Sequence, residues 1–424
     1  MQKLLLALAA LAFATPAAAQ SPFAEAKCPD SVAAVARCYS ARDAQGAYVW
    51  AAVPKAWNKR LVVHSHGGPR SGAGADDPVE DLTRFSAFVR AGYAWTGSTY
   101  RRGGYGVRMA AEDTDNSRKM FWTAFGRPER TLLHGQSWGG NIAAKAAELY
   151  ALDTDGGRNY DGVLLTNGVL MGGTRAYQFR AGLRAVYQYY CKNHPAPDEA
   201  QYPLWQGLPK GAQMSRAELR RRVDACTGVE QPPEKRTPEQ AQRLRDILTV
   251  TGVDEANLIG HLAWATNLFQ DLVHERLGGL NPFDNSQVIY AGSSDDQALN
   301  AGVQRFTADP EALARLAYDA DLSGLIVLPT VTLHALHDPV VSFEAEAQYA
   351  ATIAAAGRSH LLVQTATDED QHSKLSDSEY LAVLQALESW IDSGWRPTVA
   401  DIAGRCAANL PAYGQGCHFV AAKP

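Results

Sequence analysis

The chain has 424 residues and a formal net charge of −5 at pH 7. Its hydrophobic content of 46% and charged content of 20% are typical of a globular protein, and its length allows one large domain with an insertion. The acidic balance and the lack of nucleic-acid-binding motifs argue against a nucleic-acid partner. After the N-terminus, no stretch reaches the roughly 18–20 apolar residues of a membrane span.

The N-terminus has the three parts of an export signal. Lys3 supplies the positive start, residues 4–14 are apolar, and residues 17–19 form an A-x-A cleavage site. We expect cleavage after Ala19 or one residue later, and no cysteine stands there to carry a lipid anchor. Residues 1–19 are therefore predicted as a signal peptide of an exported protein, either periplasmic or extracellular.

Six cysteines follow this signal. An even number in an exported chain favours disulfides, but six cysteines allow 15 pairings, so the connectivity stays open. A metal site is not indicated, because no C-x-x-C pair occurs and the H-x-H pair of His64 and His66 has no further ligand cluster. Proximity in the sequence favours the pairs Cys28–Cys38, Cys191–Cys226 and Cys406–Cys417.

The first part of the chain alternates between strand and helix patterns. Residues 20–44 are predicted as a disulfide-bound leader, and residues 45–170 as the first part of a catalytic core. Alternating strands and helices predict a mostly parallel sheet. The strand-like runs lie at 47–53, from 61, and near 93–98, 131–135 and 162–166.

Two glycine motifs in this part point to acyl-transfer chemistry. The sequence H-G-G-P at 66–69 follows an early strand, where such a loop supplies a backbone N–H to an oxyanion hole. The sequence G-Q-S-W-G at 135–139 lies between an apolar strand and an alanine-rich helix, which is the setting of a nucleophile elbow. We predict Ser137 as the nucleophile and Gly67, Gly68 and Trp138 as oxyanion-hole residues. The alternatives are ordinary glycine turns, one with a structural histidine.

The pattern changes between residues 171 and 322. This stretch is rich in aromatic residues, and the sheet strands resume only near residue 325. We predict a mainly helical cap over 171–322, inserted after the sixth strand, with most of its aromatic residues in the cap's own core. Helical patterns occur near 216–224, 238–248 and 256–276.

Two strand ends near the C-terminus carry the remaining candidates. Asp338 follows the strand at 330–336 and is predicted as the acid, and His372 follows the next strand and is predicted as the general base. His360 would lie at the wrong end of the sheet, and His334 is expected in the core. The other acidic candidates are expected to be solvated: Asp295, Asp296, Asp368, Glu369 and Asp370.

Together these motifs resemble the α/β-hydrolase superfamily, in which the triad follows the chain order Ser, Asp, His. The resemblance covers roughly residues 45–170 and 320–395, and it implies an α/β-hydrolase fold, a mostly parallel sheet flanked by helices. Residues 323–395 would complete the core, and residues 396–424 would form a tail with a disulfide clip.

A narrower likeness involves residues 100–106, Y-R-R-G-G-Y-G, which are similar to the R-G-G loop of prolyl-oligopeptidase-like serine hydrolases. The chain has no room for the β-propeller of the large peptidases in that group. Because this loop follows a strand at the carboxyl edge of the sheet, we list Tyr100, Arg101 and Arg102 as possible substrate-binding residues. The alternative, which we favour for the arginines, is that they brace the loop.

The resulting hypothesis is a serine hydrolase that cleaves small or medium carboxylic esters through an acyl-enzyme on Ser137. An exported peptidase or amidase is the main alternative, followed by an acyltransferase and a non-catalytic binding protein. Haloalkane dehalogenases and epoxide hydrolases are excluded, because they need a carboxylate at the elbow. No cofactor is implied by the sequence, and the oligomeric state stays open.

Overall fold

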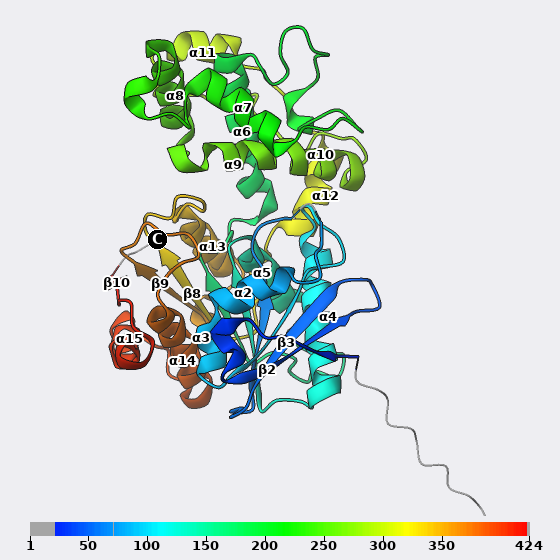
Figure 1. The fold of residues 1–424 in the computed structure, drawn as a ribbon, viewed down its shortest axis with the longest axis vertical. Helices are drawn as coiled ribbons and strands as arrows, with labels where there is room; N and C mark the ends of the chain where they lie inside the picture. The colour runs from blue at the N-terminus through cyan, green and yellow to red at the C-terminus, as the bar shows by residue number, and fades with distance from the viewer. Residues whose placement is uncertain (1–21, 71, 422–424) are drawn as a thin grey trace, which may run out of the picture.

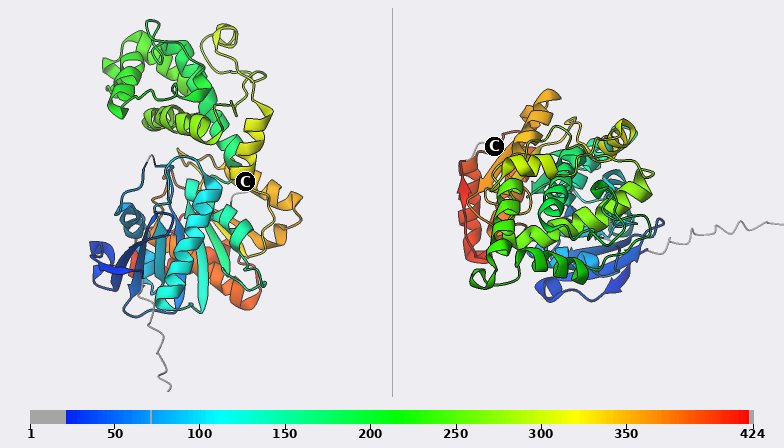
Figure 2. Two further views of the ribbon diagram at one scale, coloured as in Figure 1. Left: turned by 90° about the vertical axis from the view of Figure 1, so that its right-hand side faces the viewer. Right: turned by 90° about the horizontal axis from the view of Figure 1, so that it is seen from above.

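The computed structural model describes residues 22–70 and 72–421. The predicted signal peptide, residues 1–19, lies outside this part of the chain. Figure 1 shows a lower part built on a β-sheet and an upper part made of helices. The left view of Figure 2 shows the same division from the side.

Within the described residues, ten strands form one sheet in the order β1-β2-β3-β5-β4-β6-β7-β8-β9-β10. The six strands from β5 to β9 in this order are parallel to one another, and the outer strands join them antiparallel. The predicted mostly parallel sheet is therefore confirmed. The strands are β1 (Ala24–Ala26), β2 (Ala36–Arg42), β3 (Tyr48–Pro54), β4 (Arg60–Ser65), β5 (Ala94–Ser98), β6 (Arg130–Gln136), β7 (Gly162–Thr166), β8 (Thr330–Ala335), β9 (Leu362–Thr367) and β10 (Phe419–Val420).

The central strands are covered by helices on both faces. In β4, Leu61 and Val63 belong to the core beneath α4 and α5, whereas Val62 belongs to the opposite core beneath α3 and α14. Burial on both faces explains why these strands are continuous apolar runs in the sequence. The helices of the lower part are α1 (Asp30–Ala33), α2 (Asp77–Arg84), α3 (Ser86–Arg90), α4 (Val107–Phe125), α5 (Trp138–Tyr150), α13 (Glu344–Ala355), α14 (Asp377–Ser393) and α15 (Val399–Tyr413), with a 3-10 turn η6 (Ser359–Leu361) before β9.

Residues 172–320 lie between β7 and β8 and form the upper part in Figure 1. The helices expected in this stretch are confirmed, and α8 shows why: Thr237 and Gln240 form a capping box, and Gly252 ends the helix in the left-handed conformation. The elements are α6 (Gly172–Cys191), η1 (Leu204–Gln206), α7 (Arg216–Thr227), η2 (Pro233–Lys235), α8 (Pro238–Thr251), η3 (Glu255–Asn257), α9 (Leu258–Ala263), η4 (Trp264–Leu268), α10 (Phe269–Asp271), η5 (Leu272–Arg276), α11 (Asp296–Gly302) and α12 (Pro310–Ala320).

Both ends of the described chain add strands to the sheet. Seven strands precede the upper helical part, whereas six were expected. The leader contributes two of the seven, the antiparallel strands β1 and β2. At the other end, the segment 396–421 contains helix α15 and strand β10, which pairs with β9. None of the helices in the described residues is long and apolar enough to cross a bilayer.

Three disulfides join the six cysteines in the pairs that sequence proximity favours. Cys28–Cys38 joins the segment between β1 and α1 to β2 within the leader, and Cys406–Cys417 joins α15 to the segment before β10. In the upper part, Cys191–Cys226 connects the ends of α6 and α7. The lower and the upper part of the molecule therefore each contain at least one disulfide.

Candidate active site

Ser137 lies on a tight turn between β6 and α5. Its backbone has φ 57° and ψ −126°, a conformation that residues with a side chain rarely adopt. The glycines on either side allow the helix to cross close to the strands. A Cβ atom on Gly135 would lie 2.2 Å from the carbonyl oxygen of Gly139, and a Cβ on Gly139 would lie 2.1 Å from that of Ser65. The elbow expected from the sequence is thus present as a backbone geometry.

The structure brings Ser137, His372 and Asp338 together, although 235 residues separate the serine from the histidine. The Oγ atom of Ser137 lies 2.9 Å from Nε2 of His372, and Nδ1 of His372 lies 2.7 Å from Oδ2 of Asp338. Asp338 follows β8 and His372 follows β9, so parallel strands deliver both side chains to the edge where β6 delivers the serine.

The carboxylate of Asp338 accepts several hydrogen bonds besides that of His372. Asn167 donates its side-chain amide to Oδ2 at 2.6 Å, and the N–H groups of Val340 and Val341 donate to Oδ1 at 2.8 and 3.0 Å. Burial alone would raise the pKa of Asp338, but the hydrogen bond and charge of His372, together with Asn167, hold it below its ordinary value. The acid therefore stays ionised and fixed in orientation.

The glycine loop after β4 lies directly against the serine. A Cβ on Gly67 would be 2.9 Å from the Cβ of Ser137, and Gly68 adopts a left-handed φ of 67°. Trp138 is the first residue of α5, so its N–H has no acceptor within the helix. The three residues expected to form an oxyanion hole are thus all adjacent to Ser137.

Tyr100 packs against this loop. Its ring stacks on that of His66 with 4.1 Å between centroids, and its hydroxyl donates to the carbonyl oxygen of His66 at 3.1 Å. Tyr100 is buried, with a φ of 60°. The candidate substrate-binding tyrosine thus contacts the glycine loop after β4 and is not among the residues that line the two cavities described below.

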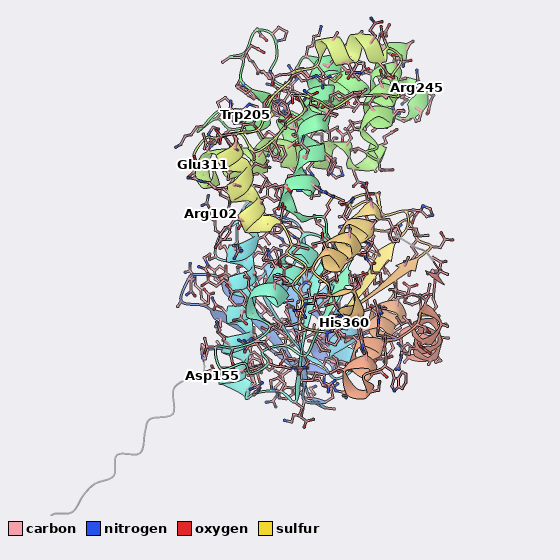
Figure 3. All side chains as sticks on the ribbon, turned by 180° about the vertical axis from the view of Figure 1, so that it is seen from behind. Arg102, Asp155, Trp205, Arg245, Glu311 and His360 are labelled. Atoms are coloured by element: carbon pink, nitrogen blue, oxygen red, sulfur yellow. A yellow bond between two sulfur atoms is a disulfide. The ribbon has the colours of Figure 1, made fainter. Side chains whose placement is uncertain are left out.

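The two candidate arginines in this segment are paired with carboxylates. Arg101 donates through Nε to Asp113 at 2.6 Å and through Nη2 to Glu112 at 2.9 Å. Arg102 donates to Asp271 at 2.7 Å, and Figure 3 shows it at the junction of the two parts of the molecule. Neither arginine lines a cavity beside Ser137, so these contacts are those of the loop-bracing alternative.

Two adjoining cavities lie beneath the upper helices. A narrow one contains Ser137, Gly68 and Trp138 together with side chains of the upper part. A second one, of about 630 Å³, contains Asp338 and shares Val169, Arg180, Val340 and Val341 with the first. Arg180 of α6 is thus common to both cavities, and the sequence analysis did not single it out.

Sequence reasoning also missed two polar neighbours of the triad, Asn167 and Gln136. The amide of Gln136 donates to Oγ of Ser373 and lies 3.4 Å from Nε2 of His372. Asn167 directly follows β7, at the same edge of the sheet as the triad. The position of each residue at a strand end was the available signal.

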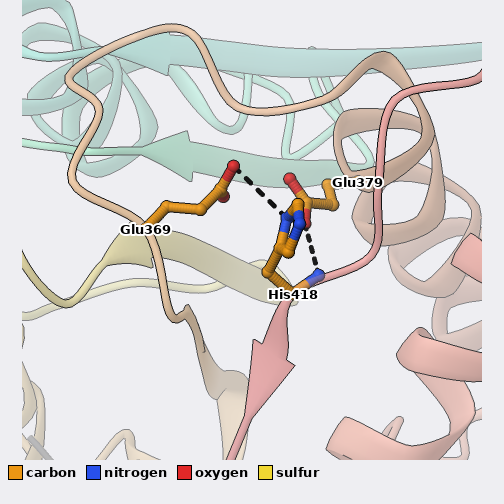
Figure 4. A group of neighbouring side chains, drawn as sticks. All are labelled: Glu369, Glu379 and His418. Carbon is orange, nitrogen blue, oxygen red and sulfur yellow. Dashed lines mark hydrogen bonds and ion pairs between the residues drawn. The ribbon is translucent and has the colours of Figure 1, made fainter.

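Metal-ligating side chains gather elsewhere. His64 is buried between Asp81, at 3.1 Å, and His134, at 2.9 Å, and belongs to the core. Among the residues described, one group of three potential ligands lies close enough to hold an ion, and Figure 4 shows it: Glu369, Glu379 and His418. This group joins the loop before His372 to the segment before β10, so it contributes to holding the C-terminal end of the chain in place.

The strand order, the elbow at the end of β6 and the Ser-Asp-His order define an α/β-hydrolase fold. No protein-family model matches the chain, and no curated protein matches it in sequence. Among solved structures, it is similar to *Candida antarctica* lipase A, with a TM-score of 0.47, 12% identity and coverage of 90% of this chain and 84% of the lipase.

An esterase from *Aspergillus oryzae* gives a TM-score of 0.41 at 14% identity, covering 85% of this chain and 80% of the esterase. The rice cell wall degrading esterase LipA from *Xanthomonas oryzae* gives 0.39 at 13% identity, covering 84% of this chain and 87% of LipA. The similar structures are thus esterases and lipases. Because these identities are too low to transfer an activity, the chemistry has to be argued from the site itself.

Proposed function

We propose that the protein is an exported serine hydrolase that cleaves carboxylic esters through an acyl-enzyme on Ser137. The observation that carries the proposal is the continuous hydrogen-bonded row from Ser137 through His372 to Asp338. In this row a neutral imidazole accepts the proton of the serine hydroxyl as the oxygen attacks the ester carbonyl.

The remaining groups act on the charges that develop. Asp338 stabilises the imidazolium of His372, and the N–H groups of Gly68 and Trp138 are the candidates to stabilise the oxyanion of the tetrahedral intermediate. His372 then donates its proton to the leaving alcohol. Water attacks the acyl-enzyme by the same route in reverse, which releases the acid and restores Ser137.

The site favours a small or medium substrate over a polymer, because side chains of the upper part line the cavity at Ser137 and the cavity beside it measures about 630 Å³. The same triad also serves amide hydrolysis. A panel of p-nitrophenyl esters and aminoacyl-p-nitroanilides separates the two activities, and we expect the esters to be turned over faster.

The test of the nucleophile is Ser137→Ala. We expect it to lower kcat by several orders of magnitude without a change in the circular-dichroism spectrum, because a triad member is lost. A fluorophosphonate probe should label the wild type at Ser137 and leave the variant unlabelled. Retention of more than a few per cent of the wild-type rate would exclude the assignment.

The proposed export rests on the N-terminal sequence and agrees with the three disulfides, which persist in oxidising compartments. N-terminal sequencing of the protein from a secreting host should give a chain that begins directly after Ala19 or Gln20.

A further inference from the structure

Arg180 carries a buried charge that no acidic group compensates. The residue is 6% exposed. Within residues 22–70 and 72–421 it forms no ion pair, and the titratable groups around it are the hydroxyls of Tyr105 and Tyr177 and the ring of His261. Burial lowers the pKa of Arg180. An unpaired buried cation is costly to a fold, so its presence calls for a partner that binds there.

The guanidinium is held in place by neutral contacts. Its Nε donates to Nδ1 of His261 at 3.2 Å, and its Nη1 donates to the carbonyl oxygen of Ala176 at 3.0 Å. Burial, followed by the charges of Arg180 and His372, lowers the pKa of His261 to about 3, so this ring stays a neutral acceptor. The rings of Phe179 and Trp264 flank the guanidinium at 4.5 and 4.8 Å.

These contacts leave Nη2 of Arg180 without an acceptor among the described residues. The side chain is thus oriented in advance, with part of its donor fork still available. The free end of the guanidinium can therefore donate a charge-assisted hydrogen bond to a carboxylate through Nη2.

Arg180 also lines the space where a substrate of Ser137 has to lie. It borders the narrow cavity with Ser137 and Gly68 and the larger cavity with Asp338. The larger cavity has three other charged residues at its walls, Arg175, Asp254 and Glu344, and all three are exposed. Asp338 is already bound to His372. Arg180 is therefore the buried cation available to an anionic group in the cavity.

We propose that Arg180 binds a carboxylate of the substrate, so that the enzyme prefers esters that carry a free acid group in either the acyl or the alcohol part. The inference rests on the proposed ester hydrolysis at Ser137. It assigns acid recognition to the helix α6 above the site, whereas Arg101 and Arg102 are occupied by carboxylates of the protein.

Two matched substrate pairs test the role and locate the acid group. For the acyl side, the mono-p-nitrophenyl ester of suberic acid is compared with its methyl-blocked analogue. For the alcohol side, 3-acetoxybenzoate is compared with methyl 3-acetoxybenzoate. We expect the wild type to prefer the acidic member of at least one pair, on the order of tenfold or more in kcat/KM, which is the effect of a charged hydrogen bond.

Arg180→Met should abolish this preference, so that the acidic and the neutral member of each pair react with similar kcat/KM. The matched control is Arg102→Met, which removes an exposed arginine outside both cavities and should keep the preference. Arg180→Lys retains the charge but loses the fork, so it should give an intermediate ratio.

The outcomes separate the inference from the proposed function. If the wild type hydrolyses neither member of any pair and resists the fluorophosphonate probe, the proposed function fails. If it hydrolyses the neutral esters with no preference for the acidic ones, the role of Arg180 fails alone. Should Arg180→Met not fold, the wild-type ratios and Arg180→Lys decide: a ratio of about one in both pairs overturns the proposal.

Discussion

Asn167 and His372 donate to the same carboxylate oxygen of Asp338, at 2.6 and 2.7 Å. The acid is therefore oriented from two sides, by a strand end of the first half of the sheet and by a loop of the second half. The side-chain amide of Asn167 donates to Asp338 and to the carbonyl oxygen of Gln371, so we regard Asn167 as a positioning residue.

We expect Asn167→Ala to lower kcat by roughly tenfold, because a charged hydrogen bond to Asp338 is lost and its orientation relaxes. KM should change little, since Asn167 does not line either cavity. Steady-state kinetics and the rate of fluorophosphonate labelling measure the effect. Equal kcat values for variant and wild type over pH 6–9 would contradict the positioning role.

The elbow gives a prediction about backbone packing. Gly139→Ala should destabilise the protein strongly and abolish activity, because the new methyl group would lie 2.1 Å from the carbonyl oxygen of Ser65. Gly404→Ala is the matched control, since Gly404 is exposed in α15 and its Cβ would meet nothing within 4 Å. The control should gain about 0.5–1 kcal/mol from helix propensity. Melting temperatures and soluble yield compare the two variants, and a native-like Gly139→Ala would refute the close crossing.

The stability should depend on pH through Glu369. Burial, followed by the charge of Glu379, raises the pKa of Glu369 from 4.5 to about 7. The native state therefore binds the carboxyl proton of Glu369 more tightly than the unfolded state does. The contribution of the protonated Glu369 to the free energy of unfolding is complete below about pH 4.5 and is lost as the pH rises through 7. His418 lies between the two carboxylates, 3.4 Å from Glu369 and 3.1 Å from Glu379.

Glu369→Gln should therefore melt at a higher temperature than the wild type at pH 8, and the difference should vanish near pH 4. The control is Asp368→Asn, which replaces an exposed neighbouring carboxylate that contacts His337. The melting temperature of this variant should show no such trend. Thermal melts at half-unit pH intervals provide the measurement. A higher melting temperature for the wild type than for Glu369→Gln at pH 8 would mean that the fold stabilises the charged form of Glu369.

The disulfides predict a graded loss of stability. The loop closed by Cys191–Cys226 spans 35 residues and that closed by Cys28–Cys38 spans 10. Replacing each pair by alanine should cost about 3–4 kcal/mol for the first and about 2–3 kcal/mol for the second, following the loop-entropy relation. Denaturant unfolding checks the order. Alkylation of the intact wild type should detect no free thiol, and an accessible thiol would refute one of the pairings.

The arrangement of Ser137, Asp338 and His372 at one site was predictable, because each of them follows a strand and belongs to a local sequence motif. Ser137 is marked by its glycines, and Asp338 and His372 follow successive apolar runs. Parallel strands place their carboxyl ends at one edge, so strand order alone brings the three together.

Arg180 could not be found in this way. It lies within a long helix whose sequence also contains Arg175 and Arg184, and only the tertiary packing shows which arginine borders the cavity. The edge strands β1 and β10 were missed for another reason. With three and two residues, they are too short to show the alternation of apolar and polar residues that marks a strand. Their pairing depends on neighbours rather than on their own composition.

The upper helical part leaves the sheet after β7 and returns at β8, and these two strands are direct neighbours, with Val163 paired to Thr330. A long connection between these two strands destabilises the sheet only slightly, because doubling the length of a loop costs only about 0.6 kcal/mol in closure entropy. Evolution can therefore lengthen, shorten or replace this part with little penalty to the stability of the sheet. In the proposed enzyme, the acid-base chemistry and the choice of substrate are encoded in separable stretches of the chain, so one can diverge while the other stays fixed.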